Sequence, residues 1–209
     1  MEIERFTAAD ILPTAKLTHT VWGDELLNEA VELKNFIYEA MVRYYCRNFH
    51  YSAKLMHENK MQGFLLAGLP TDKAADKLWL EQGMAAFSGR ERQLIYEYRE
   101  YLLYNGSNLH KQAADTDLLL YLFVSMVPGG GSRLLANAVK LAQLSKKSAL
   151  LLWADETCDY DYYYKRDFTL VEKFNNNKMS LLGEQNTAIF KKKLNKSPNI
   201  IRVKSKKYS

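Results

Sequence analysis

The stretch that decides the fold is Leu118-Leu-Leu-Tyr-Leu-Phe-Val124-Ser-Met-Val-Pro128-Gly-Gly-Gly131-Ser-Arg-Leu-Leu135. Its first seven residues are apolar or aromatic, and the run is short enough for a buried strand. Pro128 and three consecutive glycines then predict a sharp turn, because glycine adopts backbone conformations that other residues avoid. Apolar residues at helical spacing follow as far as position 145. The stretch therefore predicts a buried strand, a glycine turn and a helix.

A glycine turn at the start of a helix favours binding of phosphate groups. Glycine lets a ligand approach the main-chain N–H groups, and the first turn of a helix adds unpaired donors and a partial positive charge. The run Gly129-Gly130-Gly131 matches neither the Walker pattern nor the spaced Rossmann fingerprint. Taken alone, it is equally compatible with a tight turn that binds nothing.

Outward from this stretch, the pattern of apolar residues predicts one mixed α/β domain over residues 1–194. Ser88-Gly-Arg-Glu91 is typical of a helix start, and Asn105-Gly106 of a helix end. The expected strands lie near 1–6, 50–57, 60–69, 149–153, 168–175 and 178–193, and the expected helices near 11–22, 25–48, 72–112 and 160–165.

Composition excludes several classes of protein. Two cysteines, Cys46 and Cys158, are too few for a disulfide framework, which favours a reducing compartment, and we expect the cytoplasm. No apolar run reaches the length of a membrane helix, and the N-terminus lacks a signal-peptide segment. The net charge of +5 comes from the end of the chain: 8 of the 29 basic residues lie in 191–209, so the other 21 face 24 acidic residues. We interpret 195–209 as a basic C-terminal tail.

Two segments resemble motifs of the GNAT superfamily of N-acyltransferases. Residues 122–135 resemble its acetyl-CoA-binding motif, in which a strand ends in a valine, a glycine loop follows, and a helix opens with paired leucines. Residues 151–168 resemble the second motif, a strand followed by a short helix with Phe/Tyr-Tyr-Glu-Lys-x-Gly-Phe. The loop here is about three residues shorter than usual and lacks the family's Gln/Arg, and Asp167 replaces a glycine.

The resemblance implies a fold and a co-substrate. The fold is a single α/β (α+β) domain with a mixed, mostly antiparallel sheet of about six or seven strands flanked by helices, and 72–112 becomes a helical insertion. The co-substrate is acetyl-CoA, and no metal is implied. The implied binding residues, several of which act through their backbone, are Val124, Val127, Gly129, Gly130, Gly131, Ser132 and Arg133.

The resemblance also implies a mechanism, in which a primary amine attacks the thioester directly in a ternary complex. Tyr163 aligns with the family tyrosine that protonates the departing thiolate, although Tyr162 and Tyr164 are only one register step away. Asp155 is the first candidate for the base that accepts the amine proton, with Glu156 and Asp117 as alternatives. Each of these side chains also has a purely structural interpretation, as packing or as a capping carboxylate.

Other functions stay open at this point. A GNAT-like domain that binds acyl-CoA or a protein partner without catalysis is the main alternative, and an RNA-associated protein acting through the tail is a third. The acidic body argues against RNA, so we expect neither a nucleic-acid nor a membrane partner. The four histidines show no metal-ligand spacing. The helical stretch 72–112 is either a lid over the acceptor site or a contact in a homodimer.

Overall fold

The structure is a computed structural model that describes residues 1–26, 28–181 and 183–194 of the 209-residue chain. Its strands form one seven-stranded sheet in the order β1-β2-β3-β4-β5-β7-β6. Only β4 and β5 are parallel; every other neighbouring pair is antiparallel. The mixed, mostly antiparallel sheet expected from the sequence is therefore confirmed. The strands are β1 (Glu2–Arg5), β2 (Ala53–His57), β3 (Lys60–Gly68), β4 (Leu118–Ser125), β5 (Ala149–Asp155), β6 (Thr169–Asn176) and β7 (Gln185–Lys193).

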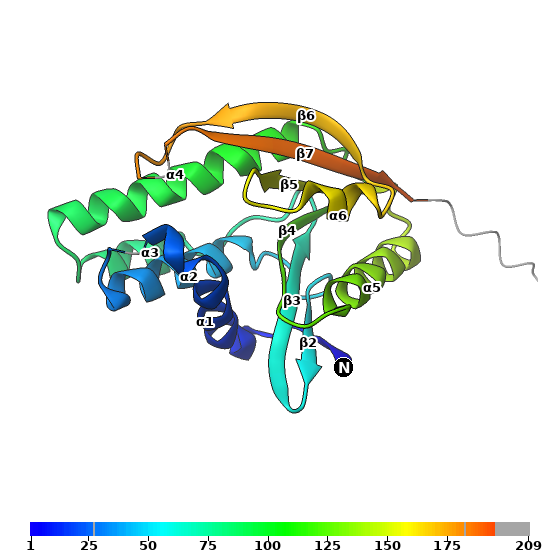
Figure 1. Cartoon of the computed structure of the whole chain (residues 1–209), viewed down its shortest axis with the longest axis horizontal. Coiled ribbons are helices and arrows are strands. Elements are labelled where there is room, and N and C mark those ends of the chain that lie inside the picture. Colours follow the sequence, from blue (N-terminus) through cyan, green and yellow to red (C-terminus); the bar gives the residue numbers. More distant parts are fainter. Residues whose placement is uncertain (27, 182, 195–209) are drawn as a thin grey trace, which may run out of the picture.

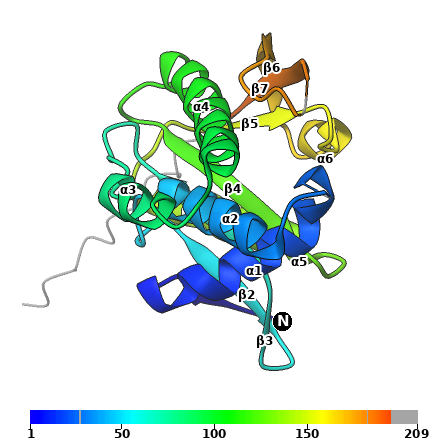
Figure 2. The ribbon, with the colours of Figure 1, turned by 90° about the vertical axis from the view of Figure 1, so that its left-hand side faces the viewer.

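Helices cover both faces of this sheet (Figures 1 and 2). Four helices pack on one face: α1 (Ile11–Trp22), α2 (Val31–Tyr45), α3 (Lys77–Met84) and α4 (Gly89–Lys111). Helices α5 (Gly130–Leu144) and α6 (Tyr160–Tyr164) pack on the other. Short 3₁₀ turns, η1 (Ala8–Asp10) and η2 (Gly23–Leu26), flank α1. In the part of the chain that is described, no helix is both long and apolar enough to cross a membrane.

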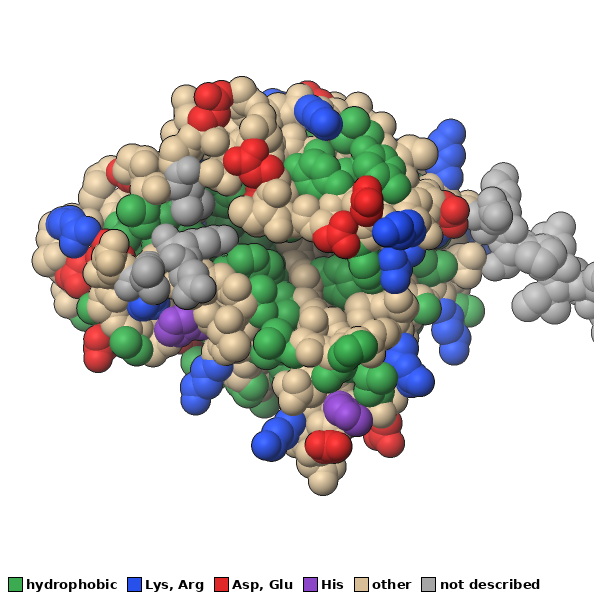
Figure 3. All heavy atoms as spheres, viewed as in Figure 1, with side chains coloured by type: hydrophobic (Ala, Val, Ile, Leu, Met, Phe, Trp, Pro, Cys, Tyr) green, Lys and Arg blue, Asp and Glu red, His purple; other side chains and the backbone are tan. Residues whose placement is uncertain are grey.

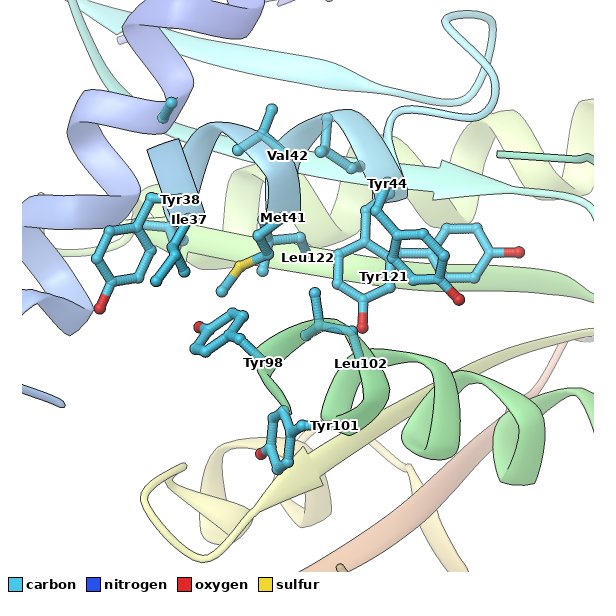
Figure 4. Packing of buried hydrophobic residues seen from close by; sticks show 14 of the residues in the cluster. Ile37, Tyr38, Met41, Val42, Tyr44, Tyr98, Tyr101, Leu102, Tyr121 and Leu122 are labelled. Carbon is cyan, nitrogen blue, oxygen red and sulfur yellow. The ribbon is translucent and has the colours of Figure 1, made fainter. Parts of the chain in front are cut away.

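Each face of the sheet has its own hydrophobic core, because side chains on a strand alternate between the two faces. On the first face, Met41 of α2 and Leu102 of α4 pack against Leu122 of β4 (Figure 4). On the second face, Leu134 and Ala138 of α5 pack against the other side of the sheet. The central strands β3, β4, β5 and β7 contribute side chains to both cores.

The prediction that a helix ends at Asn105-Gly106 is wrong, since α4 continues to Lys111. Both residues are buried. The Asn176 Nδ2 donates to the Asn105 Oδ1 at 2.8 Å, which satisfies the amide oxygen away from solvent. A Cβ on Gly106 would lie 3.1 Å from the Tyr44 hydroxyl, so glycine lets α4 approach α2 closely. These two residues therefore serve packing and not a helix end.

Other predicted boundaries move by a few residues for local reasons. The helix expected from 25 begins at Val31, because residues 23–26 form η2 and the Glu29 N–H closes a turn on the Leu26 carbonyl. The strand expected from 50 begins at Ala53, because the Asn48 side chain accepts from the His50 N–H and makes a turn. The start of α4 is as predicted, with the capping box of Ser88 and Glu91.

The first basic residues of the stretch 191–209 belong to the sheet. Lys191 and Lys192 belong to β7 and pair with Asp117 and Asp167, at 2.9 and 3.0 Å. The predicted basic tail, 195–209, lies outside the described residues. The proposed roles of 72–112 as an insertion and as a lid or dimer contact stay predictions; α3 and α4 occupy that stretch between β3 and β4.

Candidate active site

Strands β4 and β5 separate part-way along the sheet. They pair only from Leu118–Leu150 to Leu120–Leu152, although β4 continues to Ser125 and β5 to Asp155. Between β3 and β4 the register shifts at the same point, and Tyr121 is the extra residue of a β-bulge. Bulges bend a strand and increase its twist, which explains the separation. Beyond Leu120, the edge of β4 that faces β5 has no partner strand.

A cavity of about 80 Å³ opens at this separation. Most of its lining is apolar or aromatic, and it draws on α1, α2, α4, both central strands and α6. Figure 3 shows a recess with hydrophobic edges at the centre of this face of the molecule. The lining residues are Trp22, Met41, Tyr45, Tyr98, Tyr101, Leu102, Leu120, Tyr121, Leu122, Phe123, Leu152, Trp153, Ala154, Asp155, Cys158 and Tyr163.

This cavity has contributions from both faces of the sheet. Met41, Tyr98 and Trp153 belong to the core under α2 and α4, whereas Phe123 and Tyr163 belong to the core on the α5 side. The cavity at the separation of β4 and β5 is therefore lined by residues from both faces of the sheet. Two molecules approaching from opposite faces would meet between the strands.

Tyr163 is the one tyrosine of α6 that lines the cavity. Its ring packs against Phe190 and Phe168, with ring centroids 5.3 and 5.8 Å away. Burial raises the pKa of Tyr163 well above its usual value, and the neighbouring Cys158 and Tyr162 raise it further. No residue in the described ranges hydrogen-bonds to its hydroxyl. The side chain is thus a protonated phenol at neutral pH, with its proton available to a ligand.

Asp155 ends β5 and lies on the wall of the same cavity. Its Oδ1 accepts from the Thr157 hydroxyl at 2.6 Å and from the Thr157 N–H at 3.1 Å. Within the described residues, its Oδ2 accepts from the Tyr101 hydroxyl alone, at 2.7 Å, so this oxygen keeps a free lone pair. The Cys158 thiol also donates to Oδ1, at 3.7 Å, so four donor groups fix the orientation of the carboxylate, and Oδ2 can still accept one more hydrogen bond.

The glycine turn lies on the α5 side of the sheet. Gly129 is the N-cap of α5 and has φ of +76°, a left-handed conformation that favours glycine. A Cβ on Gly130 would lie 2.4 Å from the Ser125 Oγ and 2.5 Å from a Leu55 methyl group, so an added side chain would force these neighbours to shift. Within the described ranges, the N–H groups of Gly131 and Ser132 have no acceptor. The start of α5 thus offers two free amides at a positive helix end.

Arg166 places a positive charge beside these amides. Its Nη2 donates to the Ser132 Oγ at 2.6 Å, and its guanidinium stacks on the Tyr162 ring at 3.6 Å. Its Nη1 also donates to the Tyr162 carbonyl, which fixes the side chain at the end of α6. The amides and the guanidinium together form a site with the charge and donors that an anion requires.

Comparison with known proteins identifies the fold. No protein-family model and no curated protein sequence matches the chain. Solved structures do match. A GNAT-family protein from Desulfovibrio desulfuricans is 11% identical, with 93% of this chain and 99% of that one covered and a TM-score of 0.54. The chain has the GNAT fold.

Two further structures with the GNAT fold extend this result. The aminoglycoside 6'-acetyltransferase type Ii is 14% identical, with 95% of this chain and 100% of that chain covered and a TM-score of 0.54. The polyamine N-acetyltransferase of Drosophila melanogaster is 10% identical, with 92% and 99% covered and a TM-score of 0.56. At these identities the likeness concerns the fold, and the chemistry must be argued from this chain's own residues.

The residues implied by the GNAT resemblance differ in their surroundings. The Val124 side chain is buried in the core and Val124 pairs with Phe64 of β3, whereas Val127 is partly buried and its carbonyl accepts from the Gly130 N–H. The Arg133 guanidinium donates to the Met1 carbonyl at 3.0 Å, and the backbone N–H of Arg133 donates to the Gly129 carbonyl at 3.2 Å. Arg133 is therefore occupied by contacts within the protein, whereas Gly131 and Ser132 have free amides.

The alternative carboxylates lie away from the cavity. Asp117 is buried at the opposite end of β4, where it accepts from the Ala114 N–H, the Ser148 hydroxyl and Lys191. Burial by itself raises the pKa of Asp117, but these donors outweigh it and the pKa is lowered. Glu156 accepts from the Asn186 side chain at an exposed position. Both carboxylates have structural partners, and neither lines the cavity.

Two residues of the GNAT-like site were missed in the sequence. Tyr101 lies in α4 and reaches Asp155, 54 positions further along the chain, so only the folded packing of α4 reveals it. Arg166 follows Tyr162 by four residues, the spacing of one helical turn, and this spacing was the available signal. Cys158 also lines the cavity, where burial raises its pKa to about 12 and keeps it a thiol. Within the described residues, no three His, Cys, Asp or Glu side chains gather as a metal site.

Proposed function

We propose that this chain is an acetyl-CoA-dependent N-acetyltransferase that moves the acetyl group to a primary amine in a ternary complex. The observation that carries the proposal is the cavity where β4 and β5 separate, which is lined by residues from both faces of the sheet. A thioester entering from the α5 face would meet an amine held under α2 and α4. Holding two reactants in one cavity replaces a bimolecular encounter with a reaction inside one complex.

Acetyl-CoA, the acetyl carrier, would bind at the start of α5. Its diphosphate would lie against the free N–H groups of Gly131 and Ser132, with Arg166 alongside. Arg166 would supply the positive side chain that the short glycine loop lacks. The unpaired edge of β4, which ends at Ser125, would face the acyl arm and offer a backbone N–H to the oxyanion that forms on the thioester carbonyl.

The proton transfers follow from the two cavity side chains. An ammonium has no lone pair, so the amine first gives a proton to the free lone pair of the Asp155 Oδ2, directly or through water. The nitrogen then attacks the carbonyl carbon, a C–N bond forms, and the C–S bond breaks. The nitrogen loses its remaining surplus proton, directly or through water, to the Tyr163 phenolate that the next transfer leaves, so the products are a neutral amide and a free thiol. Tyr163 donates its phenolic proton to the departing sulfur, which its raised pKa permits at neutral pH.

A second candidate is a GNAT-fold module that binds acyl-CoA or a partner without turnover. The short glycine turn between β4 and α5, residues 126–129, favours this alternative. In this case the cavity would hold the acyl group, and the hydrogen bond between Asp155 and Tyr101 would only stabilise the fold.

Release of free CoA thiol separates the two candidates. The full chain would be incubated with acetyl-CoA and a panel of primary amines, with thiol release followed by a chromogenic reagent and acetylated amine by mass spectrometry. Acetyl transfer predicts one thiol for each acetylated amine. Calorimetric binding of acetyl-CoA without thiol release for any amine would instead support the binding module.

A further inference from the structure

We propose that the acceptor is a small primary monoamine on an apolar body, an alkylamine or arylalkylamine, with its nitrogen at Asp155. This inference rests on the proposed acetyl transfer and names its substrate class. It comes from the composition of the cavity wall on the α2 and α4 side, which is independent of the carrier site at the start of α5.

The cavity wall contains one charged side chain. Among the lining residues within the described part of the chain, Asp155 is the only Asp, Glu, Lys, Arg or His. The rest of the wall on the α2 and α4 side is aromatic or aliphatic, and Figure 4 shows Tyr98 and Tyr101 projecting from α4 toward this region, with Tyr98 beside Met41. Because desolvating an apolar body stabilises binding in such a pocket, the wall favours hydrocarbon over polar groups.

The phenols of this wall are uncharged at neutral pH. Burial raises the pKa of Tyr121 to about 12 and that of Tyr45 well above its usual value. They therefore offer no negative charge to a second ammonium. The tyrosine rings also contact one another and Trp153: Tyr101 packs edge-on against Trp153, with ring centroids 5.9 Å apart, and lies tilted against Tyr98, with centroids 6.2 Å apart.

A single ammonium is matched by the single carboxylate. The Asp155 Oδ2 has one free lone pair and is held in place by Tyr101, so it can pair with one N–H⁺ group. A diamine or polyamine would bring a second cation into a neutral wall, where a buried unpaired charge is strongly unfavourable. A peptide N-terminus would bring amide groups that require polar partners along the wall. A monoamine with a hydrocarbon body meets neither cost.

Matched pairs of amines test this inference. In the thiol-release assay, kcat/KM should rise about fourfold for each methylene added from ethylamine onward, until the cavity is filled. Hexylamine should exceed 1,6-diaminohexane at least tenfold, since the two differ only by the terminal ammonium. A flat series, or a diamine, spermidine, aminoglycoside or peptide used as well as hexylamine, would overturn the substrate class while leaving acetyl transfer intact.

Binding without turnover separates this inference from the proposed function. Hexylamine and 1,6-diaminohexane would each be titrated calorimetrically into the complex of the protein with CoA. Selective binding of hexylamine, with no thiol release from acetyl-CoA, would support the ligand class and contradict acetyl transfer. Absence of hexylamine binding would overturn the class.

A tryptophan pair tests the location of the pocket. Trp22 lines the cavity and is partly buried, so Trp22→Ala should change the dependence of kcat/KM on alkyl length, weakening the preference for hexylamine over ethylamine. Trp79 is also partly buried, but it stacks on Phe36 outside the cavity at 4.9 Å. Trp79→Ala should leave the length profile unchanged. An unchanged profile in Trp22→Ala, with the protein folded, would refute the placement of the acceptor.

Discussion

Replacing Tyr163 with phenylalanine removes one oxygen atom from the candidate site. The ring contacts with Phe190 and Phe168 would stay, and no described residue loses a hydrogen bond. The change in unfolding free energy should therefore stay within about 0.5 kcal/mol. For a chain of this length, that shifts the melting temperature by about 2 °C or less. The loss of a general acid should instead lower kcat by roughly 10²- to 10⁴-fold.

Two neighbouring tyrosines provide matched controls for this substitution. The Tyr162 ring lies under Arg166 and its hydroxyl faces Gly131, whereas Tyr164 is exposed. Neither lines the cavity, so Tyr164→Phe should retain the wild-type rate and Tyr162→Phe should affect mainly the affinity for acetyl-CoA. Rates come from thiol release at saturating acetyl-CoA, and affinities from calorimetry. Wild-type kcat in Tyr163→Phe, or its loss in Tyr162→Phe instead, would refute the assignment.

Three further predictions concern the turn, the base and the stability of the fold. Gly130→Ala should lower the melting temperature by roughly 2–12 °C, because overpacking costs about 1–3 kcal/mol. The control Gly89→Ala should leave it unchanged, because nothing lies within 4 Å of the added Cβ. Equal melting temperatures for the two variants would contradict the close packing at Gly130. Asp155→Asn should lower kcat/KM by roughly 10²- to 10⁴-fold, whereas Glu156→Gln should stay near the wild-type value. If thiol release is instead lost in Glu156→Gln and kept in Asp155→Asn, the general base is Glu156 and not Asp155. The lowered pKa of Asp117 stabilises the fold above about pH 4, the usual range of the unfolded carboxyl, and this contribution is lost as pH falls through the folded pKa. Asp117→Asn should therefore reduce stability at neutral pH more than at acid pH in denaturant titrations, and an equal loss at both would contradict this.

Local signals in the sequence were enough to predict most elements of the fold. The apolar run before Pro128 and the glycines after it specify β4, the turn and α5 without help from the rest of the chain. Long-range contacts decided the features that were not predictable. The bulge at Tyr121 depends on pairing with β3, and the continuation of α4 past Asn105 depends on Asn176, 71 residues away.

The site was predictable to the extent that it lies on consecutive elements. The glycine turn and Tyr163 follow from two short motifs, and the structure gives both a suitable setting. Sequence could not decide between Tyr163 and its neighbours, because the direction of a side chain on a five-residue helix depends on how that helix packs. Tyr101 and Arg166 were missed since their partners lie on other elements.

A crystal structure of the full chain with acetyl-CoA tests the central claim most directly. The account predicts the diphosphate against the amides of Gly131 and Ser132 with Arg166 beside it. It also predicts that the thioester carbonyl lies between the separated strands, with the thioester sulfur within hydrogen-bonding distance of the Tyr163 hydroxyl. Acetyl-CoA bound on another surface, with nothing between β4 and β5, would contradict the account.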